Sequence, residues 1–205
     1  GSDILLCLAI ASLLWAGFMA LSAKTLRDLL GFSLLASVGT LLMGIAQASP
    51  DALSASLYYM PTGTLLLAFG YVCAAEIQAT RTDTQDQLQG GASLAPWLKI
   101  AIFIMILGIS GLPPMAGFVA KVWLLQQISS AQIWVWGAIL ISAVLLLFMW
   151  IRAASAFIWN NQPSHAPKTS SRRAGLVLAL FLALGLYSSL GAGQISQQTQ
   201  TIAEQ

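Results

Sequence analysis

Six long apolar stretches follow one another along the chain, separated by short polar segments. A helix of about 20 residues is needed to cross a hydrocarbon core about 30 Å thick, and each stretch is close to that length or longer. Backbone polar groups in lipid must be satisfied within helices or closed barrels, and the short alternating pattern of barrel strands is missing. The sequence therefore predicts an all-α, polytopic transmembrane helix bundle that forms one membrane domain over residues 1–205. The six predicted spans cover about residues 4–22, 29–47, 53–78, 97–128, 132–159 and 174–193.

The fourth stretch, residues 97–128, is too long for one straight span at 1.5 Å per residue. Gly111, Pro113 and Pro114 lie in its middle, and proline removes a backbone donor and clashes with the preceding turn. We therefore predict a broken helix with its break near residues 110–114. Freed carbonyl groups at membrane depth are tolerated where they are buried in protein or line a wet cavity.

Composition narrows the class of protein. Hydrophobic residues make up 58% of the chain and charged residues 8%, with a mean hydropathy of +0.80, which excludes a water-soluble monomer. The net charge of +2 comes from scattered basic residues, so nucleic acid is not an expected partner. Two cysteines and one histidine stand apart, so we expect no metal, no cofactor and no covalent catalysis. Two tryptophans, Trp15 and Trp150, lie deep in their spans and are predicted to pack between helices.

Basic residues also predict an orientation. When the six spans are threaded back and forth, eight of the nine Lys and Arg residues fall in or beside the same set of loops. An excess of basic residues marks the cytoplasmic side, so both termini of this chain are predicted to lie outside. The eight residues are Lys24, Arg27, Arg81, Lys99, Arg152, Lys168, Arg172 and Arg173.

The ninth basic residue, Lys121, lies inside the fourth span, shortly after the predicted break. A lysine in the middle of a span costs about 2.5–3.5 kcal/mol on insertion scales, and such residues often mark an ion or proton path. A different interpretation is that Lys121 extends its side chain to the outer surface and carries no ion. The nearby helix break favours the first interpretation, because discontinuous helices form the binding sites of transporters.

The string SGLPPMAGFVAK resembles the most recognisable motif of the antiporter-like membrane subunits, a family shared by Mrp-type multisubunit Na+/H+ antiporters and respiratory complex I. In that family a lysine after this run lies on a broken helix and belongs to the proton path. The resemblance implies this role for Lys121, which matches by position.

Two further segments resemble the family and also differ from it. In AKTLRDLLGFSLLASVGTLLMGIA, Arg27, near Lys24, occupies the place where many members have a buried lysine; it is either a path residue that keeps its charge or an anchor at the helix end. In SLYYMPTGTLLLAFGYV, many relatives have histidine or lysine. Here Tyr58, Tyr59, Thr62 and Thr64 occur instead, so hydroxyl groups and bound water would carry the proton.

The Tyr-Tyr-x-Pro run, the stretch LLFMWIRAASAFIW and the polar tail resemble the D subunit of Mrp-type antiporters most. This implies a proton-translocating subunit in a bacterial cytoplasmic membrane, with other membrane subunits, the lipid bilayer, H+ and Na+ as partners. One alternative is a proton-pumping subunit of a complex I-like or membrane-bound hydrogenase complex, and a second is a structural subunit without an ion path. The resemblance covers only the carboxyl-terminal part of a usual member, so we expect a fragment that holds one half of an inverted repeat.

Overall fold

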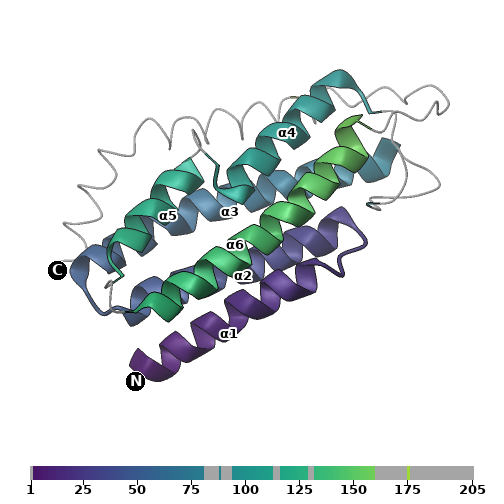
Figure 1. Ribbon diagram of the computed structural model, residues 1–205. Helices are drawn as coiled ribbons and strands as arrows, with labels where there is room; N and C mark the ends of the chain where they lie inside the picture. Colours follow the sequence, from purple (N-terminus) through teal and green to yellow (C-terminus); the bar gives the residue numbers. More distant parts are fainter. Residues whose placement is uncertain are drawn as a thin grey trace.

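Six α-helices make up most of the described part of the chain (Figure 1). The structure is a computed structural model, and it describes residues 2–80, 88, 94–112, 116–128, 132–159 and 175. No β-strand occurs in these residues, in agreement with the predicted all-α class. The helices are α1 (Ser2–Ala20), α2 (Leu26–Ala46), α3 (Pro50–Thr80), α4 (Pro96–Ser110), α5 (Ala116–Gln126) and α6 (Ile133–Ala154), and α6 continues into a π-helical turn, η1 (Ser155–Trp159).

Local sequence signals set several helix ends. Thr25 caps α2: its side chain accepts the Asp28 N–H at 3.0 Å, and the Asp28 carboxylate accepts the Thr25 N–H at 3.1 Å. Pro96 stands in the first turn of α4, where a missing N–H costs nothing. Gly111 follows the last residue of α4 with φ of +70°, a left-handed conformation that favours glycine.

The predicted long fourth span consists of two helices. After α4 ends at Ser110, the N–H groups of Gly111 and Leu112 turn back to the Gly108 and Leu107 carbonyls, and α5 begins at Ala116. In Figure 1 α4 and α5 follow one another along the bundle, and both pack against α3. Pro113 and Pro114 lie outside the described residues, as does the predicted span 174–193 apart from residue 175.

Four helical segments of the described chain are long and apolar enough to cross a membrane: α1, α2, residues 50–79 and residues 133–158. The short α4 is also apolar. The chain is therefore a polytopic helical membrane protein. Close packing of the bundle depends on small residues: a Cβ atom placed on Gly39 of α2 would lie 2.7 Å from Ser12 Oγ and 3.1 Å from the Ala9 carbonyl oxygen of α1.

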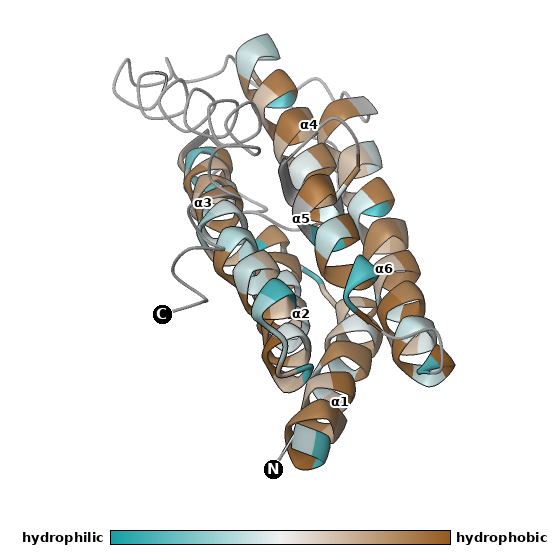
Figure 2. Cartoon of the chain, turned by 90° about the vertical axis from the view of Figure 1, so that its left-hand side faces the viewer, coloured by the Kyte–Doolittle hydropathy of each residue, from teal (hydrophilic) through white to brown (hydrophobic). Residues whose placement is uncertain are grey.

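Hydrophobic residues cover most of the length of the outer helices α1 and α6 (Figure 2). Trp150 of α6 is 1% exposed, which confirms the predicted packing. The same prediction is wrong for Trp15, which is 61% exposed, because α1 packs on α2 and α6 and turns its other face outward. Depth along a helix does not decide which face a side chain occupies.

Four of the basic residues lie where helix ends meet at one end of the bundle. Lys24 and Arg27 stand at the start of α2, Lys99 at the start of α4, and Arg152 at the end of α6. The Arg27 guanidinium donates a hydrogen bond to Gln78 Oε1 near the end of α3. Lys99 Nζ donates to the Ile158 carbonyl at 3.3 Å, so contacts across helices join these ends.

Candidate functional site

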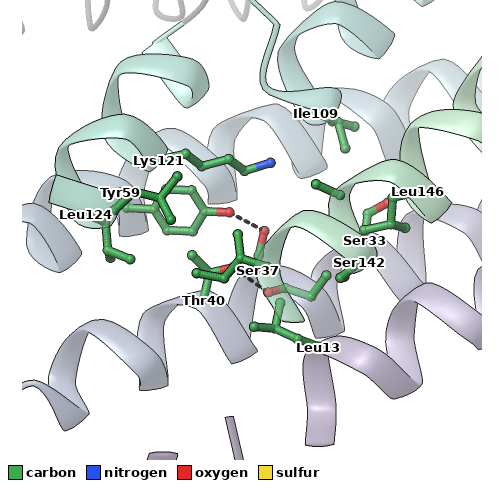
Figure 3. A pocket seen from close by; sticks show the side chains of 14 residues that line it. Leu13, Ser33, Ser37, Thr40, Tyr59, Ile109, Lys121, Leu124, Ser142 and Leu146 are labelled. Carbon is green, nitrogen blue, oxygen red and sulfur yellow. Dashed lines mark hydrogen bonds between the residues drawn. The ribbon is translucent and has the colours of Figure 1, made fainter. Parts of the chain in front are cut away.

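Lys121 lies at the middle of α5, and its side chain reaches back to the end of α4 (Figure 3). A Cβ atom placed on Gly111 would lie 3.0 Å from Lys121 Nζ and 3.1 Å from its Cδ. The carboxyl end of a helix carries a partial negative charge, so the end of α4 favours an ammonium group at this position. The break between α4 and α5 therefore creates the place that the lysine head occupies.

Two cavities lie beside this lysine. The larger has a volume of about 50 Å³ and the smaller about 20 Å³, which is room for a few water molecules and for about one. Both cavities are lined by Ser37, Tyr59, Ile109 and Lys121, so the two cavities adjoin one another at these residues. No acidic side chain of the described residues lines either cavity.

The larger cavity lies at mid-depth in the bundle, and each of the six helices contributes to its wall. Leu13 of α1, Ser37 of α2 and Ser142 of α6 all line it, and each stands near the middle of its helix. The ends of these helices lie at the two ends of the bundle (Figure 1). The ammonium of Lys121 is thus far from both ends.

Hydroxyl groups supply most of the polarity of the larger cavity. Ser37 Oγ and Tyr59 Oη form a hydrogen bond of 3.0 Å between α2 and α3 (Figure 3). Thr40 Oγ1 donates to the Ala36 carbonyl at 2.9 Å. Ser33 Oγ donates to the Leu29 carbonyl at 2.8 Å and accepts from Trp150 Nε1 at 3.1 Å.

Other residues predicted for the path lie elsewhere. Lys24 and Arg27 are exposed at the basic end of the bundle and line neither cavity. Tyr58 and Thr62 are buried in α3 but also line neither cavity. The Tyr58 ring packs against Trp123 with centroids 6.0 Å apart, and Thr62 Oγ1 donates to the Tyr59 carbonyl at 2.8 Å.

The sequence reasoning missed most of the cavity wall. Ser33, Ser37 and Thr40 recur at intervals of four and three residues, which places them on one face of a helix. This signal was available from the sequence alone. Ser142 is the one hydroxyl residue in the apolar run 133–149, and only the structure shows that it lines the same cavity as Lys121.

Comparison with known proteins assigns the chain to a family. The family described as NADH:quinone oxidoreductase/Mrp antiporter, TM, matches residues 2–147. The chain belongs to this family. The match includes α1 to α5, both cavity-lining hydroxyl groups of the Ser37–Tyr59 pair, and Lys121.

Curated relatives are similar over most of this chain. NADH-quinone oxidoreductase subunit N 2 of Acidobacterium capsulatum is 28% identical over 89% of this chain and 38% of its own length. NADH-quinone oxidoreductase subunit N of Moorella thermoacetica is 29% identical over 92% of this chain and 40% of its own length. The chain thus spans about two fifths of the length of these relatives.

Solved structures share the fold. A chain of respiratory complex I from Thermus thermophilus has a TM-score of 0.84 at 22% identity, with 99% of this chain and 44% of that chain covered. A chain of the Mrp complex from Dietzia sp. has a TM-score of 0.80 at 19% identity, with 98% and 46% covered. At these identities the likeness concerns the helix arrangement alone.

Proposed function

We propose that the chain is the proton-conducting part of a subunit in a multisubunit membrane complex, and that Lys121 carries the proton. The observation that supports this most is the position of the Lys121 head, beside the end of α4 and between two cavities with room for water. Intramembrane ionisable residues usually face a polar interior and belong to an ion or proton path. A lysine can release its proton and take up another, whereas arginine keeps its charge.

The direction of the side chain argues against a structural anchor. To reach the surface near the end of α5, the ammonium would have to extend toward Ile128. Instead both Cδ and Nζ of Lys121 lie beside Gly111, toward the middle of the bundle. A structural subunit with a surface-seeking lysine is therefore the less favoured function.

Two kinds of membrane complex are candidates for the parent of this chain. Relatives named NADH-quinone oxidoreductase subunit N favour a redox-driven proton pump. The fold is shared with a chain of an Mrp complex, which supports a Na+/H+ antiporter subunit, the D-type subunit that the sequence resembles, as the second candidate. In either complex the chain would conduct protons in the cytoplasmic membrane of a bacterium, beside other membrane subunits.

The first experiment measures proton movement in vesicles that hold the full parent complex, with Lys121→Arg and Lys121→Ala. Both variants should lower the transport rate by about 100-fold or more, as expected for loss of a proton-transfer group. Lys99→Arg, a charge-conserving change at the end of the bundle, is the matched control and should transport normally. Transport at the original rate in Lys121→Arg would contradict the proton-carrier role, since only charge and reach would then matter.

A second experiment identifies the parent complex by its partners and its driving force. Purification of the complex with flavin and iron–sulfur subunits, and proton movement driven by NADH oxidation with a quinone, would establish the redox-driven pump. Purification with small membrane subunits alone, and proton movement driven by a Na+ gradient, would establish the antiporter.

A further inference from the structure

Ser142 of α6 is a buried hydroxyl group without a hydrogen-bond partner in the described part of the chain. Its side chain is 1% exposed, and it lines the larger cavity together with Lys121. A serine or threonine inside a helix often donates to the carbonyl four residues before it, as Ser33 and Thr40 do here. Ser142 makes no such bond, and a buried hydroxyl that lacks a partner is costly.

The hydroxyl of Ser142 is also enclosed by protein. Gly17 of α1 lies directly against it, because a Cβ atom on Gly17 would be 3.2 Å from Ser142 Cα and 3.5 Å from Ser142 Oγ. The absence of a side chain at Gly17 lets α1 approach and cover this part of α6. Ser142 thus lines the cavity at a point where α1 and α6 are in close contact.

Other hydroxyl groups of the wall are already engaged. Ser33 donates to a carbonyl and accepts from Trp150 Nε1, Thr40 donates to a carbonyl, and Ser37 pairs with Tyr59. Among the described residues of the cavity wall, Ser142 is the hydroxyl with both its donor and its acceptor available. The ammonium of Lys121, which lines the same cavity, supplies further donors.

We propose that the larger cavity binds a short file of water molecules between Lys121 Nζ and Ser142 Oγ, and that Lys121 exchanges its proton through this water. The cavity of about 50 Å³ has room for a few water molecules. Each water needs two to four polar partners, and Lys121, Ser142 and the Ser37–Tyr59 pair supply them. This inference rests on the proposed function and adds α6 to the proton path.

The transfer step conserves protons. The N–H bond of the Lys121 ammonium breaks as its proton joins the first water, which at the same time passes one of its own protons to the next water or to Ser142 Oγ. Ser142 Oγ passes its original proton to another water of the same cavity, which then holds the excess proton as hydronium. One proton leaves Lys121, the cavity water gains one proton, and each broken O–H bond is replaced by a new one.

The test uses Ser142→Val and Ser142→Thr in the full parent complex. Valine removes the hydroxyl and fills part of the cavity, so the proton transport rate should fall about tenfold or more, the usual size of the effect of one lost hydrogen bond. Threonine keeps the hydroxyl and should restore most of the rate. Ser12→Ala is the matched control, because the Ser12 hydroxyl donates to the Ala9 carbonyl and Ser12 lines neither cavity.

A structure of the complex that resolves ordered water supplies the second measurement. Water within about 3 Å of Ser142 Oγ in the original protein, together with slow transport in Ser142→Val, would support the proposal. Original rates in Ser142→Val, or a dry cavity, would overturn it. If Ser142→Val transports normally while Lys121→Ala does not, the water file is refuted and the proposed function stands; if Lys121→Ala also transports normally, the proposed function fails.

Discussion

The head of Lys121 lies beside Gly111, although Gly111 caps the end of α4 and Lys121 stands in the next helix, α5. A Cβ atom on Gly111 would be 3.0 Å from Lys121 Nζ, 3.1 Å from Cδ and 3.4 Å from Cε. Gly111 also has φ of +70°, which residues with a side chain adopt only with strain. One glycine thus ends α4 and leaves the space that the lysine head fills.

Gly111→Ala should displace the Lys121 side chain and strain the backbone by about 1–2 kcal/mol. We expect proton transport by the assembled complex to fall by about tenfold or more, because a displaced proton carrier loses its alignment with the cavities. Gly137→Ala is the matched control: Gly137 lies in α6 with nothing within 4 Å of an added Cβ atom. Equal transport rates in the two variants would show that the Gly111–Lys121 contact has no role.

Tyr59→Phe should weaken the polar wall that the two cavities share. The change removes the hydroxyl that pairs with Ser37 Oγ at 3.0 Å and keeps the ring. We expect slower proton transport and a loss of stability of about 1 kcal/mol, the usual net value of one hydrogen bond. Tyr71→Phe, an exposed tyrosine on the same helix, should leave both the transport rate and the thermal stability unchanged.

Gly39→Ala should destabilise the contact between α1 and α2. The added Cβ atom would lie 2.9 Å from Leu13 Cγ and 3.1 Å from the Ala9 carbonyl oxygen, which belongs to the helix backbone and cannot turn away. Overpacking of this kind costs about 1–3 kcal/mol. Gly31→Ala in the same helix has only Tyr71 Oη near it, at 4.0 Å, and should be neutral or stabilising. Thermal unfolding of the purified complex compares the two, and a lower stability in Gly31→Ala than in Gly39→Ala would contradict this account.

The predicted orientation can be tested by labelling of single cysteines. In a chain whose native Cys7 and Cys73 are replaced, Ser22→Cys lies at the basic end of the bundle and Asp51→Cys at the other end. Because basic residues mark the cytoplasmic side, an impermeant thiol reagent applied from outside should label residue 51 and spare residue 22. The reverse pattern would invert the topology, and labelling of both from one side would refute it.

The sequence identifies Lys121 as a candidate site residue more readily than it identifies the other residues of the cavity wall. A charged residue in an apolar run and a proline–glycine break are visible in the linear chain, because each violates a local rule of membrane helices. Arg27 and Lys24 also stood out by charge and by resemblance. In the structure both are exposed at the bundle end, where their charge can be solvated.

The hydroxyl groups of the cavity were much harder to predict. Serine is common in membrane helices, so Ser142 and Ser37 carry no sign of function on their own. Tyr58 and Tyr59 are neighbours in the chain, but successive residues of a helix point in directions about 100° apart. Only Tyr59 turns toward α2 and Lys121, while Tyr58 packs on Trp123.

The sequence by itself determined that this chain crosses a membrane as helices, where the long fourth stretch breaks, and which basic residue lies inside an apolar stretch. Those properties follow from hydropathy, proline geometry and charge, which act within one segment. Only the tertiary structure decided that six helices meet around the cavity beside Lys121, that Gly111 leaves room for the lysine head, and that Ser142 of α6 lines the same cavity. Such relationships join residues far apart in the chain, and they depend on which face each helix buries against its neighbours.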